Sequence, residues 1–209
     1  MSNCEDPCWL ALSPARRAAL LDKHRYSETR YHDWWNGVHE QFDESCLKVG
    51  IRVDRMQFSG FSCQGDGASF EGQVEDWPKF LALLGKPELA KLADEERWQF
   101  SSMSRGHYSH SGCMSFTAEL GIPDNPYDAE DDLLRHATWA IANPVTEAVI
   151  KQLETGFSAQ FRELADTLYK NLETEYDWLT DDEQVIERIL DDEDAMSDSE
   201  DVEDLEEPA

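Results

Sequence analysis

The chain has 209 residues, and its 45 acidic side chains outnumber its 18 lysines and arginines, which leaves a formal net charge of −27 at pH 7. A field of that sign repels nucleic acid and anionic membrane surfaces, and it favours partners with a basic surface, such as enzymes that act on nucleic acids. Hydrophobic residues make up 40 % of the chain, enough for a buried core, yet no run approaches the roughly 20 apolar residues of a membrane-spanning helix.

The N-terminal segment and the cysteines favour a reducing compartment. Acidic residues stand where a signal peptide carries bases, and the apolar run that follows is short. The five cysteines are an odd number, and Cys4 and Cys8 have no second pair at the spacing of a zinc ribbon. We therefore expect a cytoplasmic protein with free thiols and a flexible N-terminus over residues 1–12.

Two helices are predicted before the first strand. Ser13 can cap a helix that Pro14 begins. A second helix over residues 31–49 places apolar side chains three and four residues apart on one face, and Gly50 ends it as a residue that tolerates positive φ. The apolar positions of that face are Trp35, Val38, Phe42, Cys46 and Val49.

The pattern then changes to a strand period. Residues 51–58 alternate apolar and polar side chains with a shift near Arg55, which predicts a strand with a β-bulge. Residues 68–74 are its predicted partner, and residues 97–104 and 107–120 form a second predicted hairpin. Short helices are expected between the hairpins, from Trp77 to Gly85 and from Pro87 to Asp94.

Beyond a turn-rich linker at residues 121–126 the chain is predicted to be helical. A first helix covers residues 128–142. A second, over residues 145–176, carries a regular apolar stripe that Gly156 is expected to bend or divide. A last helix runs to Leu190 and begins at a capping box made by Thr180 and Glu183.

These elements predict an α+β protein, with one domain over residues 13–190. Its four-stranded antiparallel sheet is expected to be covered by the helices at residues 31–49 and 145–176. Residues 191–209 hold 11 acids and no base, so they are predicted to form a disordered acidic tail, and −16 of the net charge remains for the rest of the chain.

The densest candidate site is the segment FSGFSCQGDGASF at residues 58–70, where phenylalanines flank small residues. One hypothesis is a hairpin turn, in which glycine supplies positive φ and Asp66 bonds its own backbone. The other is a ligand-binding loop formed by Gln64, Gly65, Asp66 and Gly67. The glycine spacing differs from that of a phosphate-binding loop, and no lysine follows.

The segment HYSHSGC contains His107, His110 and Cys113 at a spacing that resembles a zinc site. On a strand, however, alternate side chains face opposite sides, so His110 would point away from the other two residues. We therefore expect a polar strand, no metal site and no cofactor.

The two hairpins suggest one more arrangement. If the four strands form a meander, the first loop and the start of the last strand lie near each other, and a histidine beside a carboxylate is a common acid–base pair. Ser59 or Cys63 would then be the nucleophile of a small enzyme. The polar residues of such a cleft are Ser59, Gln64, Asp66, His107 and His110.

Three blocks carry a resemblance to a known family: FSGFSCQGDGASFEG, HYSHSGCM and LYKNLETEYDWLTDDEQVIERI, in this order within residues 31–190. Together they resemble an uncharacterised protein family of tailed phages, prophages and mobile elements of proteobacteria. The resemblance implies a phage or prophage origin and a non-structural role inside the host cell. It implies no activity.

With no strong catalytic signature in the chain, the leading hypothesis is an accessory protein that binds another protein without catalysis, in an anti-defence or host-takeover role. The acidic surface would meet a basic host or phage protein, including a host nucleic-acid enzyme. The alternative is a small enzyme or ligand-binding protein that uses residues 59–66 with His107 and His110.

Overall fold

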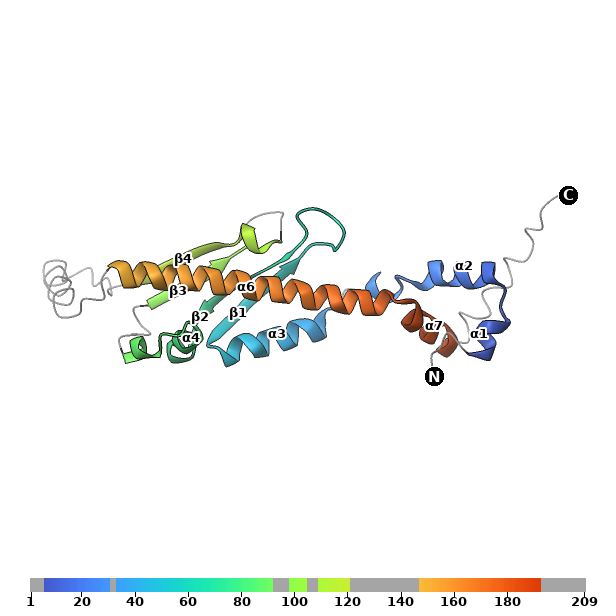
Figure 1. Cartoon of the computed structure of the whole chain (residues 1–209), viewed down its shortest axis with the longest axis horizontal. Helices are drawn as coiled ribbons and strands as arrows, with labels where there is room; N and C mark the ends of the chain where they lie inside the picture. The colour runs from blue at the N-terminus through green and yellow to red at the C-terminus, as the bar shows by residue number, and fades with distance from the viewer. Residues whose placement is uncertain (1–5, 31–32, 92–97, 105–108, 121–146, 193–209) are drawn as a thin grey trace, which may run out of the picture. The chain divides into compact units, whose positions relative to one another are not determined.

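The computed structural model describes residues 6–30, 33–91, 98–104, 109–120 and 147–192 (Figure 1). It contains a four-stranded antiparallel sheet in the order β1-β2-β3-β4, together with helices, which confirms the predicted α+β class and the meander. The chain falls into two compact units, one made of Met1–Gly37 with Leu172–Ala209 and the other of Val38–Asn171. The single domain expected over residues 13–190 stays a prediction.

The sheet lies in the unit Val38–Asn171 and consists of β1 (Ile51–Phe58), β2 (Ala68–Val74), β3 (Trp98–Met103) and β4 (Ser115–Leu120). The register of β1 on β2 shifts between Val53 and Arg55, so the predicted bulge is present. At Gly72, opposite this bulge, a Cβ atom would lie 2.5 Å from the carbonyl oxygen of Arg52. A residue without a side chain therefore lets the bulged strand approach β2 closely.

One face of the sheet forms the core of this unit with α3 (Asn36–Lys48), α4 (Trp77–Leu83) and α6 (Glu147–Thr180). The ring of Phe70 on β2 lies 5.3 Å from that of Phe42 on α3 and 5.1 Å from that of Phe161 on α6. The two helices predicted to cover the sheet therefore do so. The fully buried rings of this core are Phe70, Trp77, Phe80, Phe100, Phe157 and Phe161.

The other unit packs α1 (Pro7–Ala11), α2 (Pro14–His24) and α7 (Asp182–Asp191) around a small apolar cluster, and it includes the short 3-10 turn η2 (Glu28–Arg30). Ser13 caps α2 as predicted, because its hydroxyl accepts a hydrogen bond from the amide of Arg16 at 3.3 Å. Residues 7–11, expected to be flexible, instead form a helix that Asp6 caps. The cluster consists of Trp9, Leu20, Val185, Ile186 and Ile189.

One prediction about the C-terminal helices is wrong and another is wrong in part. Gly156 does not divide α6, which is a continuous helix of 34 residues, and a bend at this glycine stays a prediction. Thr180 does not cap α7, because it lies inside α6 and its hydroxyl donates to the carbonyl oxygen of Tyr176 at 2.8 Å. The cap is Asp181, whose carboxylate accepts from the amide of Glu183 at 2.9 Å. An aspartate one residue later provides the cap instead.

Some predicted elements lie outside the described residues: the linker at 121–126, the helix at 128–142 and the tail beyond 192. Among the helices that the structure describes, none combines the length and the apolar character needed to cross a membrane. The remaining described elements are the 3-10 turns η3 (Pro87–Lys91) and η4 (Ser111–Cys113).

The buried thiol of Cys46 on α3 provides a test of this packing. Burial, with a smaller contribution from Asp43, raises the pKa of this thiol to about 12. Because the thiolate is the reactive form, we expect iodoacetamide at about pH 8 to modify the exposed Cys8 and Cys63 in the folded protein, and Cys46 only after unfolding in urea. Peptide mass spectrometry measures each rate. Equal rates for Cys46 and Cys63 in the folded protein would contradict the burial of α3.

Candidate functional site

The loop between β1 and β2 is closed at its base by two hydrogen bonds. The amide of Ser59 donates to the carbonyl oxygen of Gly67 at 3.0 Å, and the amide of Gly67 donates to the hydroxyl oxygen of Ser59 at 3.3 Å. Phe58 and Ala68 form the last paired positions of the two strands. The candidate nucleophile Ser59 therefore holds the two ends of the loop together.

Asp66 holds the loop from inside. Its Oδ2 atom accepts hydrogen bonds from the amides of Ser62 at 2.8 Å and Cys63 at 2.6 Å. Its own amide donates to the carbonyl oxygen of Cys63 at 3.1 Å, and Gly65 has a φ of 102°. A carboxylate that bonds its own loop beside a glycine with positive φ is typical of a turn, as the hairpin hypothesis requires.

Aromatic side chains fasten the loop to α6. The ring of Phe61 stacks between Phe58, at 5.9 Å, and Tyr169 of α6, at 5.6 Å. The hydroxyl of Tyr169 also donates to the carbonyl oxygen of Gly60 at 3.2 Å. Sequence reasoning missed Tyr169. Its neighbours Leu168 and Leu172 marked the buried stripe of the helix, but no local signal connects a tyrosine with a loop more than a hundred residues earlier.

His110 packs against the base of this loop. A Cβ atom at Gly67 would lie 2.9 Å from Cδ2 of His110 and 3.0 Å from the carbonyl oxygen of Ser109. The two segments therefore do meet, as the predicted meander implied, and a glycine is needed where they meet. His107, the other candidate histidine, lies outside the described residues.

The predicted strand over residues 107–120 is shorter than expected. Its described part begins as a strand only at Ser115, and the turn η4 precedes it. Nδ1 of His110 accepts from the amide of Gly112 at 2.8 Å and so caps this turn. His110 and Cys113 therefore do not lie on a strand, and the prediction that their side chains alternate between two faces is wrong. Within the described ranges, no group of three or more His, Cys, Asp or Glu residues could hold a metal ion.

The candidate polar groups thus have structural tasks. Ser59, Asp66 and His110 each accept a hydrogen bond from a backbone amide. Cys63 and Gln64 lie exposed at the tip of the loop. The arrangement therefore favours a rigid hairpin with its tip exposed to solvent. It is less consistent with a set of groups poised for proton transfer.

We expect Asp66→Ala to lower the free energy of unfolding by about 1–3 kcal/mol, because two backbone amides lose their acceptor. Asp66→Asn should recover part of the loss, since it keeps an acceptor oxygen. The matched control is Gln64→Ala at the exposed tip, which should change stability by less than about 0.5 kcal/mol. Urea unfolding measures all three. Equal effects of the alanine variants at Asp66 and Gln64 would contradict the turn hypothesis.

A second candidate site is the acidic surface, which we define as the carboxylates of residues 172–192. This segment carries nine acidic residues and one base, Arg188. One of the acids, Asp182, accepts a hydrogen bond from the guanidinium of Arg25 at 2.6 Å, and this bond raises the pKa of Arg25. Seven of the nine are exposed: Asp177, Asp181, Asp182, Glu183, Glu187, Asp191 and Asp192.

Comparison with known proteins adds a family. A family model described as a domain of unknown function, DUF8835, matches residues 34–182. The match includes the loop at residues 59–67, the sheet and the whole of α6. No curated protein and no solved structure matches the chain.

Proposed function

We propose a protein-binding function for this chain, which belongs to the DUF8835 family. It acts as an accessory protein in the cytoplasm, where it binds a positively charged host or phage protein through the acidic surface and catalyses no reaction. The observation that carries the proposal is the concentration of exposed carboxylates on residues 172–192. Such a surface attracts a basic partner over long range and speeds the encounter.

Trp178 supports a protein partner. It lies on α6 within the acidic surface, and 52 % of its surface is exposed. Tryptophan is enriched among the residues that contribute most to binding at protein interfaces, and its ring also attracts the cationic side chains of arginine and lysine. An exposed indole among carboxylates thus suits a basic surface, whereas the phosphates of nucleic acid would be repelled.

The resemblance of the three sequence blocks to proteins of tailed phages and prophages gives the proposal its biological setting. In that setting the partner is a protein of the infected cell or of the phage, and the role is anti-defence or host takeover. A host enzyme that handles nucleic acid fits the chemistry, because its DNA-binding face is basic.

A small enzyme or ligand-binding protein remains the second candidate, because His110 meets the base of the loop at Gly67. It would use residues 59–66 with His107 and His110. The hydrogen bonds from backbone amides to Asp66 and His110 favour the binding function, since these groups already support the local backbone.

The test is capture from host lysate by the full-length chain at low salt, followed by measurement of binding to the captured protein. The variant Asp177→Lys/Glu183→Lys/Glu187→Lys reverses three exposed charges. It spares Asp181, which caps α7, and Asp182, which pairs with Arg25. We expect it to weaken binding at least about tenfold. The matched control also replaces three exposed acids by lysine, but in the other unit, at Glu40, Glu154 and Glu163, so both variants change the net charge by the same amount.

Equal losses in the two triple variants would show that only net charge matters and that residues 172–192 form no specific surface. Deletion of residues 193–209 is the companion experiment. We expect it to shift the melting temperature by only a few degrees and to slow association more at low salt than at high salt, because salt screens long-range attraction. Failure to capture any basic protein would count against the whole proposal.

A further inference from the structure

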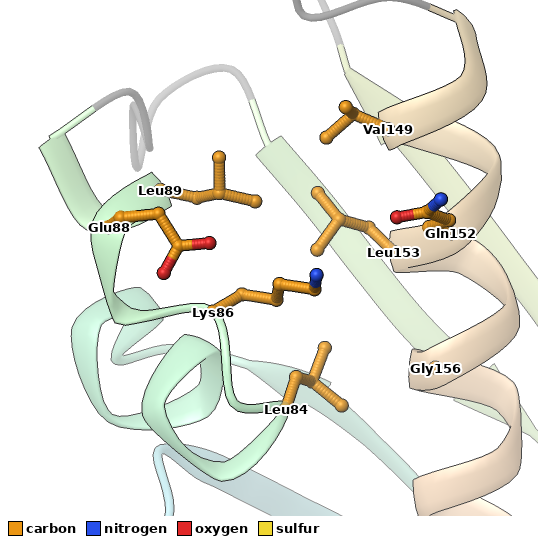
Figure 2. Close-up of a pocket in the computed structure, with 8 residues that line it drawn as sticks. All are labelled: Leu84, Lys86, Glu88, Leu89, Val149, Gln152, Leu153 and Gly156. Carbon is orange, nitrogen blue, oxygen red and sulfur yellow. The ribbon is translucent and has the colours of Figure 1, made fainter.

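A small cavity of about 140 Å³ lies between the end of α4, the turn η3 and the first turns of α6. Its walls are mainly aliphatic: Leu84 and Leu89 line one side, and Val149 and Leu153 of α6 line the other (Figure 2). All of these residues belong to the unit Val38–Asn171. Neither the loop at residues 59–67 nor the acidic surface contributes to this cavity.

The cavity also contains a positive charge, which the backbone positions there. Gly85 ends α4 with a φ of 67°, and the amide of Lys86 donates to the carbonyl oxygen of Leu81 at 2.7 Å. This hydrogen bond is typical of a helix end capped by glycine. It fixes the backbone of Lys86 and so the direction in which its side chain leaves the chain. Figure 2 shows the side chain of Lys86 extending across the cavity toward Leu153, and the carboxylate of Glu88 lines the same cavity from η3.

No residue in the described part of the chain forms an ion pair with Lys86, although two other lysines do pair: Lys48 with Glu44 at 3.9 Å and Lys79 with Asp76 at 2.6 Å. In a chain with 45 acidic residues, a lysine that faces aliphatic walls stands out. An ammonium group among leucines favours a ligand with an apolar body and one negative charge, since charge-assisted hydrogen bonds are the stronger kind.

The size of the cavity restricts the ligand further. Binding sites for drug-sized molecules have volumes of about 300–1,000 Å³, which this cavity does not reach. An engineered protein cavity of about 150 Å³ lined by aliphatic and aromatic side chains binds benzene. We propose that the cavity binds a free small carboxylate with an apolar body about the size of one aromatic ring, held by Lys86 and the leucine walls.

The experiment titrates the full-length protein with benzoate, at about 150 mM salt so that the field of the whole chain is screened beyond about 8 Å. Amide chemical shifts in NMR spectra report the binding. We expect a dissociation constant on the order of 1 mM, with shifts centred on residues 84–89 and 149–156. Benzylamine, which has a similar ring and the opposite charge, should bind at least about tenfold more weakly.

Two variants test the two parts of the site. Lys86→Gln should weaken benzoate binding about tenfold and remove the preference for benzoate over benzylamine. Gly156→Val should weaken both ligands, because Gly156 lines the cavity and a Cβ atom there would already touch a methyl carbon of Leu84 at 3.4 Å, so the two methyl groups of valine would occupy part of the cavity. The control is Lys151→Gln, which removes an exposed lysine of α6 that does not line the cavity. Thermal unfolding verifies that each variant is folded.

Absence of benzoate binding up to about 20 mM would overturn the proposal, as would equal binding of benzoate and benzylamine. So would a Lys86→Gln variant that binds as the unmodified chain does. The proposal is independent of the protein-binding function, because none of its residues lies in the acidic surface and its assay needs no partner protein.

Discussion

Replacing Phe161 by alanine should lower the free energy of unfolding by about 3–5 kcal/mol. The side chain is fully buried, and its ring lies 4.4 Å from that of Phe157 and 5.1 Å from that of Phe70 on the sheet. Removal of the ring takes away the contact between α6 and β2 and leaves a cavity that rigid neighbours fill only partly. Because domains of this size are stable by about 5–15 kcal/mol, much of the stability would be lost.

Urea unfolding followed by circular dichroism measures this loss. Met103→Ala is the matched control, because Met103 lies on the opposite face of β3 and is 59 % exposed. We expect that control to change the free energy of unfolding by less than about 0.5 kcal/mol. A loss at Phe161 no greater than the loss at Met103 would show that α6 does not pack on the sheet.

Three glycines provide a second large and graded effect. Gly50 has a φ of 83°, and a Cβ atom there would lie 2.2 Å from the carbonyl oxygen of Asp76. Gly85 has a φ of 67° with open space around it, and Gly37 has open space and no positive φ. The series Gly37→Ala, Gly85→Ala and Gly50→Ala therefore adds first backbone strain and then a steric clash.

We expect Gly37→Ala to raise the free energy of unfolding by about 0.4–1 kcal/mol, because alanine restricts the unfolded chain and suits α3. Gly85→Ala should lower it by about 1–2 kcal/mol through left-handed strain alone. Gly50→Ala should lower it by about 3 kcal/mol or more, since the new methyl group displaces the backbone at Asp76. Thermal and urea unfolding rank the three variants by their free energies of unfolding. Any order in which Gly50→Ala is the mildest of the three contradicts the close approach of α3's end to the start of α4.

The difference between Gly85 and Gly50 also shows which features local sequence predicts well. A glycine after a helix indicates that the helix ends, and both positions were predicted on that ground. The carbonyl oxygen of Asp76 beside Gly50 comes from a residue 26 positions away. No local pattern contains that contact, so the severity of the substitution follows only from the tertiary structure.

The candidate site divides in the same way. The turn at residues 64–67 could be predicted, because glycine and aspartate act within four residues of one another. The nearness of His110 to this loop followed from the predicted meander, but its close contact with Gly67 did not. The support from Tyr169 of α6 could not be predicted at all, because it joins segments that the folded chain brings together over a long separation. The cap at Asp181 was missed for a local reason, since two adjacent residues, Thr180 and Asp181, compete for the same task.

The cavity beside Lys86 had no sequence signal at all. Its leucines lie at the end of α4, in η3 and on α6, where apolar residues are ordinary, and Lys86 is simply the residue after a glycine. The acidic surface could be predicted only in part. Its charge follows from the composition, but the exposure of Trp178 among the carboxylates depends on which face of α6 is buried.

The α+β class, the four strands with their bulge, the helix ends at Gly50 and Gly85, and the acidic character of the chain could all be predicted from the amino-acid sequence. These features depend on side-chain period and on residues close together in the chain, where backbone geometry dictates the outcome. Three features came from the folded chain alone: Asp66 and His110 support the backbone, α1 buries Trp9, and Lys86 faces a small apolar cavity. Each of these depends on contacts across the fold, which arise from the shared burial of apolar surface and have no counterpart in local sequence.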